Sequence, residues 1–168
     1  TMTRWTAQGF EVSRNGFTDN IIQEEAASGA YAITPAFVEG GGALEFTCPT
    51  SHPTFDVGFG SNGGNTCKYG FRISNAGTVY PIINGTVSNS YIATDVDGTD
   101  ISIRKESKNI YLRVDGIGSA TRTISLSDAA ETDTSVGIIR TEGTEAALNL
   151  TGLRTGGIDD VGYMAELS

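Results

Sequence analysis

Short runs in which apolar and polar residues alternate recur through most of this chain. Leu44 and Phe46, for example, alternate with Glu45 and Thr47. Successive side chains of a β-strand point to opposite faces, so this period of two predicts a strand with one buried face and one face in water. The predicted strands are the segments 43–47, 55–59, 68–73, 100–105, 109–114, 122–126, 135–140 and 146–150.

Residues that favour tight turns separate these runs. Asn84–Gly85, which lies between the segments 78–83 and 86–91, is the strongest short signal for a hairpin. Further turns are predicted at 75–77, 107–109 and 115–116. Helical periodicity is almost absent, and the segment 19–29 fits either a helical turn or a short strand followed by a loop.

This arrangement of short strands and turns predicts an all-β fold. About a dozen strands with little helix indicate an antiparallel two-sheet β-sandwich, or jelly roll. A chain of 168 residues suits a single domain, which we expect to span residues 1–168. Residues 1–40 are expected to include an N-terminal arm or edge strands.

The charge of the chain excludes two classes of partner. The formal net charge is −9, whereas binding to the nucleic-acid backbone requires an excess of Lys and Arg. The same acidity argues against an anionic membrane surface. No stretch approaches the roughly 20 apolar residues that span a bilayer, so we expect no membrane insertion.

The motifs of residues 42–117 carry a family resemblance. They read GALEFT, DVGFGS, YGFRISNAGTVYPIING and TDISIRKESKNIYLRVDG in chain order. This order is similar to that of the concanavalin A-like jelly roll of the laminin-G and SPRY-like type. The resemblance implies a binding module, since such domains occur in lectins, adhesive ectodomains, bacteriophage tail fibres and virion appendages.

We therefore expect a non-catalytic domain of an extracellular or virion surface that acts in attachment or decoration. Its partners would be a cell-surface glycan or other virion and surface proteins, and a homo-oligomer stays an open alternative. Glucanases of this fold class carry an E-x-D-x-x-E strand, which is absent here, so we expect no enzyme activity. The alternative function is a calcium-assisted carbohydrate-binding module of a polysaccharide-degrading protein.

Three aspartates, Asp95, Asp97 and Asp100, surround Gly98 just before a predicted strand. Calcium takes six to eight oxygen ligands, and short acidic runs with a glycine can supply several of them. The cluster lacks the further acids of an EF-hand loop. We favour a polar turn that leads into the strand, with a calcium site as the alternative and no cofactor required.

Cys48 and Cys67 are the only cysteines, and His52 is the only histidine. These residues fall short of the four ligands of a structural zinc site. If the segments 43–47, 55–59 and 68–73 form a meander, the two cysteines lie at opposite rims of the sheet. We therefore favour free or buried thiols over a disulfide, and we expect His52 to be a solvated loop residue.

Exposed aromatic side chains are candidates for stacking on sugar rings. Tyr80, Tyr91 and Tyr111 are the candidate ligand-binding residues, and Tyr111 falls on the polar phase of its predicted strand. The alternative is that each tyrosine packs on its cross-strand neighbour. Trp5, the single tryptophan, is expected to plug one end of the core.

Overall fold

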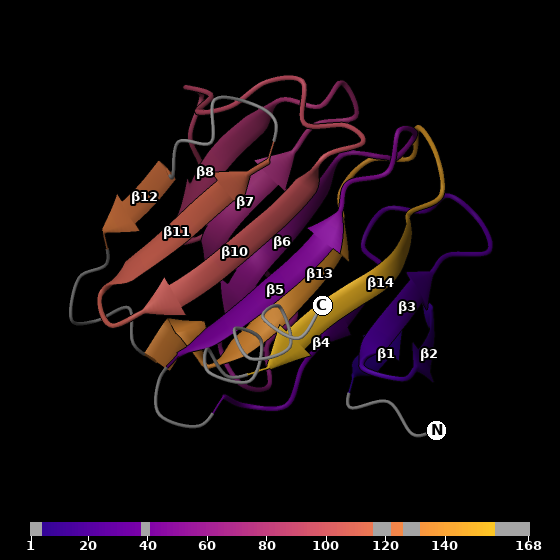
Figure 1. The fold of residues 1–168 in the computed structure, drawn as a ribbon, viewed down its shortest axis with the longest axis horizontal. Helices are drawn as coiled ribbons and strands as arrows, with labels where there is room; N and C mark the ends of the chain where they lie inside the picture. The colour runs from indigo at the N-terminus through magenta and orange to yellow at the C-terminus, as the bar shows by residue number, and fades with distance from the viewer. Residues whose placement is uncertain (1–4, 38–40, 116–121, 126–131, 157–168) are drawn as a thin grey trace.

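The computed structural model describes residues 5–37, 41–115, 122–125 and 132–156. Within these residues, two seven-stranded antiparallel sheets are stacked face to face (Figure 1). A short 3-10 turn at Thr132–Thr134 is the only helical element of the described ranges. None of the described helices has the length and apolar character that crossing a membrane requires.

The back sheet takes strands from the whole length of the described chain. In spatial order these strands are β1 (Thr6–Gln8), β4 (Tyr31–Ile33), β13 (Val136–Thr141), β6 (Phe55–Gly60), β7 (Tyr69–Ile73), β8 (Val79–Ile83) and β9 (Thr86–Val87).

The front sheet faces the viewer of Figure 1. Its strands are β12 (Arg122–Ser125), β11 (Asn109–Val114), β10 (Asp100–Glu106), β5 (Gly42–Thr47), β14 (Asn149–Gly156), β3 (Thr18–Ile22) and β2 (Glu11–Asn15). Strand β14 joins its two halves, because it pairs with β3 through Asn149 and Leu150 and with β5 through Arg154–Gly156.

The fold is an all-β sandwich, and most of the alternating runs form strands as predicted. The run 146–150 is an exception, because strand β14 begins only at Asn149. Asn84 and Gly85 both have positive φ, 51° and 78°, in the tight hairpin between β8 and β9. The segment 19–29 contributes to strand β3 and then a loop rather than a helical turn. Gly116 and Leu126, which belong to a predicted turn and strand, lie outside the described residues.

The core lies between the sheets and takes the apolar phase of each strand. Ile101 and Ile103 of β10 and Phe55 of β6 are at most 1% exposed. The rings of Phe46 and Phe55 meet edge to face across the sandwich, with centroids 6.3 Å apart. Burial of each such side chain stabilises the fold by about 1.5–3 kcal/mol, which is why the alternation determines which face of each strand turns inward.

Trp5 belongs to this core, as predicted. Its side chain is 7% exposed, and its Nε1 donates a hydrogen bond to Asp19 Oδ2 at 3.0 Å. Asp19 is itself buried and lies in β3. The indole thus anchors the chain before β1 to the front sheet.

The segments 43–47, 55–59 and 68–73 do not form a meander, although the two thiols are free, as favoured. Strand β5 lies in the front sheet, whereas β6 and β7 pair in the back sheet. Cys48 therefore follows a front-sheet strand, and Cys67 precedes a back-sheet strand. Both thiols are free and buried.

Candidate functional site

A groove of about 870 Å³ lies on the outer face of the front sheet. Strands β5, β10, β11, β12 and β14 supply its floor and walls. Its lining is mostly polar and consists of Glu45, Phe46, Thr47, Asp100, Ile101, Ser102, Arg104, Glu106, Tyr111, Arg113, Asp115, Thr123, Gly152 and Arg154. This set of residues is called the groove below.

The strand register aligns the groove side chains in rows across the sheet. Ser102 of β10 is paired with Glu45 of β5 on one side and with Arg113 of β11 on the other. Arg154 of β14 is paired with Glu45 in turn. Adjacent strands are about 4.8 Å apart, so this row of four polar side chains is about 14 Å long.

Each arginine of the groove forms an ion pair with a carboxylate. The pairs are Arg154 Nη2–Glu45 Oε2 at 3.3 Å, Arg104 Nη2–Glu106 Oε1 at 3.0 Å and Arg113 Nε–Asp115 Oδ1 at 3.1 Å. The fourth carboxylate, Asp100, accepts a hydrogen bond from Thr47 Oγ1 at 2.6 Å. With four carboxylates and three arginines in the lining, the groove has a formal charge of −1.

Tyr111 lies in this groove, as the polar phase of its strand predicts. Its neighbours in the chain, Ile110 and Leu112, are at most 1% exposed, while Tyr111 is half-buried on the opposite face. It is paired with Arg104 on β10 and with Thr123 on β12. The tyrosine ring is therefore flanked by polar side chains that can form hydrogen bonds.

The other two predicted tyrosines lie elsewhere. Tyr80 is on β8 of the back sheet, paired with Arg72. Tyr91 is 63% exposed in the segment between β9 and β10. Of the three tyrosines, only Tyr111 is among the residues that line the groove, and the ligand-binding role of Tyr80 and Tyr91 stays a prediction.

The three aspartates are not brought together. Asp95 is exposed, has a φ of 58° and accepts a hydrogen bond from Thr94 Oγ1. Asp100 belongs to the groove, whereas Asp97 faces Cys48 and His52. The one group of three potential metal ligands within the described ranges is Cys48, His52 and Asp97, called the crossover cluster below.

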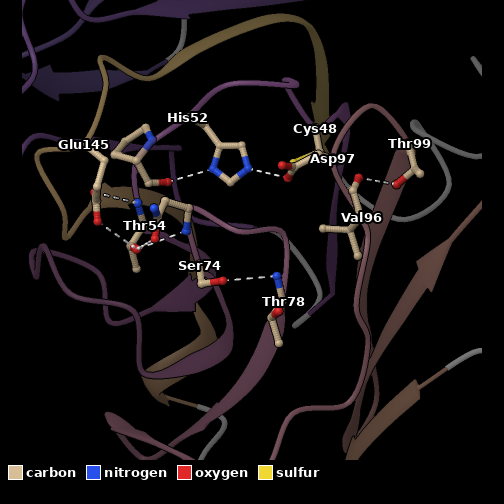
Figure 2. Close-up of polar contacts among 11 residues, drawn as sticks. Cys48, His52, Thr54, Ser74, Thr78, Val96, Asp97, Thr99 and Glu145 are labelled. Carbon is tan, nitrogen blue, oxygen red and sulfur yellow. Dashed lines mark hydrogen bonds and ion pairs between the residues drawn. The ribbon is translucent and has the colours of Figure 1, made fainter.

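His52 is buried, so the expectation of a solvated loop histidine was wrong. Its side chain is 0% exposed, and its ring meets the Phe55 ring edge to face with centroids 5.3 Å apart. The Nε2 atom lies 2.5 Å from Asp97 Oδ1, and Nδ1 lies 2.7 Å from the Pro53 carbonyl oxygen (Figure 2). The loop covers one end of the core, which removes the ring from water.

Burial also decides the chemistry of the two thiols. It raises the pKa of Cys48 to about 12, with a further contribution from the negative charge of Asp97. Burial raises the pKa of the Cys67 thiol as well. Since the thiolate is the nucleophile, neither cysteine is poised for nucleophilic catalysis at neutral pH.

Comparison with solved structures gives a consistent group of matches. The SPRY domain of human HERC1 matches with a TM-score of 0.60 and 11% identity, over 90% of this chain and 94% of that chain. The carbohydrate-binding module CBM66 from Bacillus subtilis matches with a TM-score of 0.56 and 12% identity, over 93% and 97%. The lectin from Bauhinia forficata in complex with GalNAc matches with a TM-score of 0.57 and 11% identity, over 93% of each chain.

The fold is a concanavalin A-like jelly roll. At these identities the likeness establishes the fold and not the activity. Enzymes with this jelly roll are among the matches, including a family 7 alginate lyase and a sialidase, of whose chain the match covers 17%. No known family model matches this chain, and neither does any curated protein sequence.

Tyr111 and Asp100 were predicted as site residues from the sequence, whereas the other charged residues of the groove were not. Glu45, Arg104 and Arg113 occupy the polar phase of predicted strands, so the signal was present. The alternation predicts that they face outward, but it does not predict that β5, β10 and β11 are adjacent in one sheet.

Proposed function

We propose that this chain is a non-catalytic glycan-recognition domain that acts in attachment or decoration at an extracellular or virion surface. The observation that carries the proposal is the groove, in which an aromatic ring lies among rows of hydrogen-bonding side chains. Lectins and a carbohydrate-binding module have the same fold, which supports glycan as the ligand class.

The chemistry of the groove suits a sugar. An aromatic face supplies a flat apolar surface for the ring of a saccharide, and carboxylates and guanidinium groups form strong, directional hydrogen bonds with hydroxyl groups. The ion pairs between Arg and Glu or Asp hold these side chains in position before a ligand arrives, which reduces the ordering cost of binding.

The charge balance favours a neutral glycan over a polyanionic one. The groove has a formal charge of −1, and the whole chain has −9. Each groove arginine already contacts a carboxylate. A sulfated or uronate-rich glycan would therefore compete with these carboxylates and meet a repulsive field.

A binding role fits the groove better than glycan cleavage. Glycoside hydrolysis needs a proton-donating acid opposite a second carboxylate across the scissile bond. In the groove as described, each carboxylate is engaged by an arginine or a threonine. These contacts support a fixed recognition surface.

A glycan-array screen tests the proposal. The labelled chain is applied to arrays of neutral and anionic oligosaccharides, once with calcium and once with a chelator. We expect retention on neutral glycans, with affinity about tenfold weaker in Tyr111→Ala because the stacking surface is lost. Arg113→Ala, which removes a hydrogen-bonding group from the central row, should also weaken retention.

Phe17→Ala is the matched control, because Phe17 is an exposed aromatic residue in the turn between β2 and β3, outside the groove. If Tyr111→Ala and Arg113→Ala retain glycans as well as the wild-type chain does, the groove is not the binding site. If the wild-type chain retains no glycan, the proposed function is wrong. Retention that disappears with the chelator would favour the calcium-assisted alternative.

A further inference from the structure

The crossover cluster lies where the chain passes between the two sheets. Cys48 and His52 belong to the segment that leads from β5 of the front sheet to β6 of the back sheet. Asp97 belongs to the segment that returns from β9 of the back sheet to β10 of the front sheet. None of its three residues lines the groove, so a site at the cluster is independent of the proposed function.

Backbone hydrogen bonds hold the two segments together at the cluster. The N–H of Cys48 donates to the Thr99 carbonyl, and the N–H of Gly98 donates to the Cys48 carbonyl, each at 2.8 Å. Asp97 directly precedes this pair of bonds. Its carboxylate fits closely over Gly77, where an added Cβ would lie 2.9 Å from Asp97 Oδ1. The backbone of Asp97 is thus held beside Cys48 by the fold, while its side chain keeps its rotational freedom.

Three different donor atoms converge at this point. Cys48 Sγ, one ring nitrogen of His52 and a carboxylate oxygen of Asp97 all lie within 4.8 Å of one another. Figure 2 shows one edge of the imidazole facing Asp97. The other ring nitrogen lies against the Pro53 carbonyl oxygen. Cys48 and His52 are buried, while the Asp97 side chain is 29% exposed.

The hydrogen bonds of His52 determine which nitrogen is available. A carbonyl oxygen can only accept, so Nδ1 must carry the hydrogen in its contact with Pro53. This leaves Nε2 as the nitrogen that faces Asp97 and Cys48. Histidines that ligate a metal typically donate their other ring N–H to a backbone carbonyl or a carboxylate, which fixes the ring. His52 has this supporting contact.

We propose that Cys48, His52 and Asp97 form a binding site for a divalent transition-metal ion of the zinc class. One thiolate, one imidazole and one carboxylate are a donor set typical of Zn²⁺, and three protein ligands leave a fourth position for water. The partly exposed Asp97 marks the side from which the ion and that water enter. Calcium and magnesium take oxygen ligands instead, so the donor set discriminates against them.

Binding of the metal ion removes a hydrogen from each of the two contacts that Asp97 makes, with Cys48 and with His52. In the metal-free protein, Asp97 Oδ1 is shared by the Cys48 thiol, at 3.8 Å, and by His52 Nε2, at 2.5 Å. The cation displaces the thiol proton and the proton shared between His52 and Asp97, and both leave to solvent. The Nε2–Oδ1 separation then has to open to roughly 3.4 Å, the spacing of two ligands on tetrahedral zinc, which a rotation of Asp97 supplies.

Cobalt titration of the full chain tests this site. The reduced, metal-stripped chain, without a histidine tag, is titrated with Co²⁺ while its absorption spectrum is recorded, and Zn²⁺ is then added as competitor. We expect one equivalent of Co²⁺ to bind with a Kd in the micromolar range or below, with a near-ultraviolet thiolate-to-cobalt band that Zn²⁺ removes. A wild-type titration without that band overturns the proposal.

Cysteine variants assign the band to the cluster. Cys48→Ala should abolish it, whereas Cys67→Ala, which removes the other buried thiol, should retain it. The same band from Cys48→Ala overturns the proposal. If Cys48→Ala fails to fold, Asp97→Asn replaces it, because this change is isosteric and the side chain is partly exposed. We expect Asp97→Asn to bind Co²⁺ at least tenfold more weakly. An unchanged affinity would overturn the proposal, because Asp97 would then be a structural partner of His52 and not a metal ligand.

Discussion

Arg72 forms a bidentate ion pair with Asp56 across the pairing of β6 and β7, with Nε–Oδ1 at 2.8 Å and Nη2–Oδ2 at 3.1 Å. The pair lies on the outer face of the back sheet, where Asp56 is only 4% exposed. Loss of one partner leaves a buried charge without compensation. Arg72 is thus needed to compensate the buried charge of Asp56, which the strand register places opposite it.

Arg72→Met is therefore expected to lower the free energy of unfolding by about 3 kcal/mol. Arg113→Met is the control, because the Arg113–Asp115 pair is exposed, at 61% and 56%, and such pairs contribute at most about 1 kcal/mol. Urea denaturation followed by circular dichroism measures both. Equal losses in the two variants would contradict this account.

Glu142→Gln is expected to raise the thermal midpoint at pH 7. Burial raises the pKa of Glu142 above its ordinary value of 4.5, with a further rise from Asp56, and these effects outweigh the attraction of Arg72 and Arg140. A raised folded-state pKa gives a contribution to stability that is full below pH 4.5 and is lost as the pH rises through the folded pKa. The advantage of the variant should therefore shrink between pH 7 and pH 4, as measured by calorimetry across this range.

Gly70→Ala is expected to destabilise the back sheet. Gly70 is paired with Gly58, and a Cβ at Gly70 would lie 2.5 Å from the Val57 carbonyl oxygen and 2.9 Å from Cys67 Sγ. Overpacking against backbone costs about 1–3 kcal/mol, measured by thermal unfolding. The loop variant Gly64→Ala, whose nearest neighbour would be Ser61 O at 3.3 Å, should change stability by less than about 0.5 kcal/mol.

Trp5→Phe should reduce stability, because the Asp19 carboxylate loses its hydrogen-bond donor. The indole is the donor to Asp19 Oδ2, and Asp19 Oδ1 has no hydrogen-bond partner. A buried acceptor that loses its donor costs about 1–3 kcal/mol. Pairing this change with Asp19→Ala, which removes the acceptor, in a double-mutant cycle measures the coupling, and additive losses would mean that the hydrogen bond contributes nothing.

The two thiols should resist a thiol reagent in the native protein. Cys48 and Cys67 are 0% and 5% exposed and are not bonded to each other. Burial also raises the pKa of Cys67. We expect slow labelling at pH 8 in buffer and rapid labelling of two thiols per chain in denaturant. Rapid labelling of the native chain would show that the interior is open.

The strands could be predicted from the sequence because their evidence is local. Ile101, Ile103 and Ile110 alternate with polar residues, and the short turn between Glu106 and Asn109 fixes the register of β10 and β11. The assignment of strands to sheets could not be predicted in this way. Alternation is the same for a strand in either sheet, so nothing in the local pattern places β5 and β6 on opposite sides of the core.

The histidine illustrates the same limit. His52 lies in a short segment with prolines on both sides of it, at Pro49 and Pro53, which has the composition of an exposed loop. Its burial results from the passage of that segment over the end of the core, beside Phe55. The partner carboxylate, Asp97, is 45 positions away in the chain, so no spacing rule connects the two residues.

Strand β14 is an interior strand of the front sheet, between β5 and β3, although it is the last strand of the described chain. During synthesis, both neighbours therefore leave the ribosome long before the segment that hydrogen-bonds to each of them. Until residues 149–156 emerge, the edges of β5 and β3 remain open to pairing with other chains. Chaperone demand during translation should accordingly peak just before this segment is released.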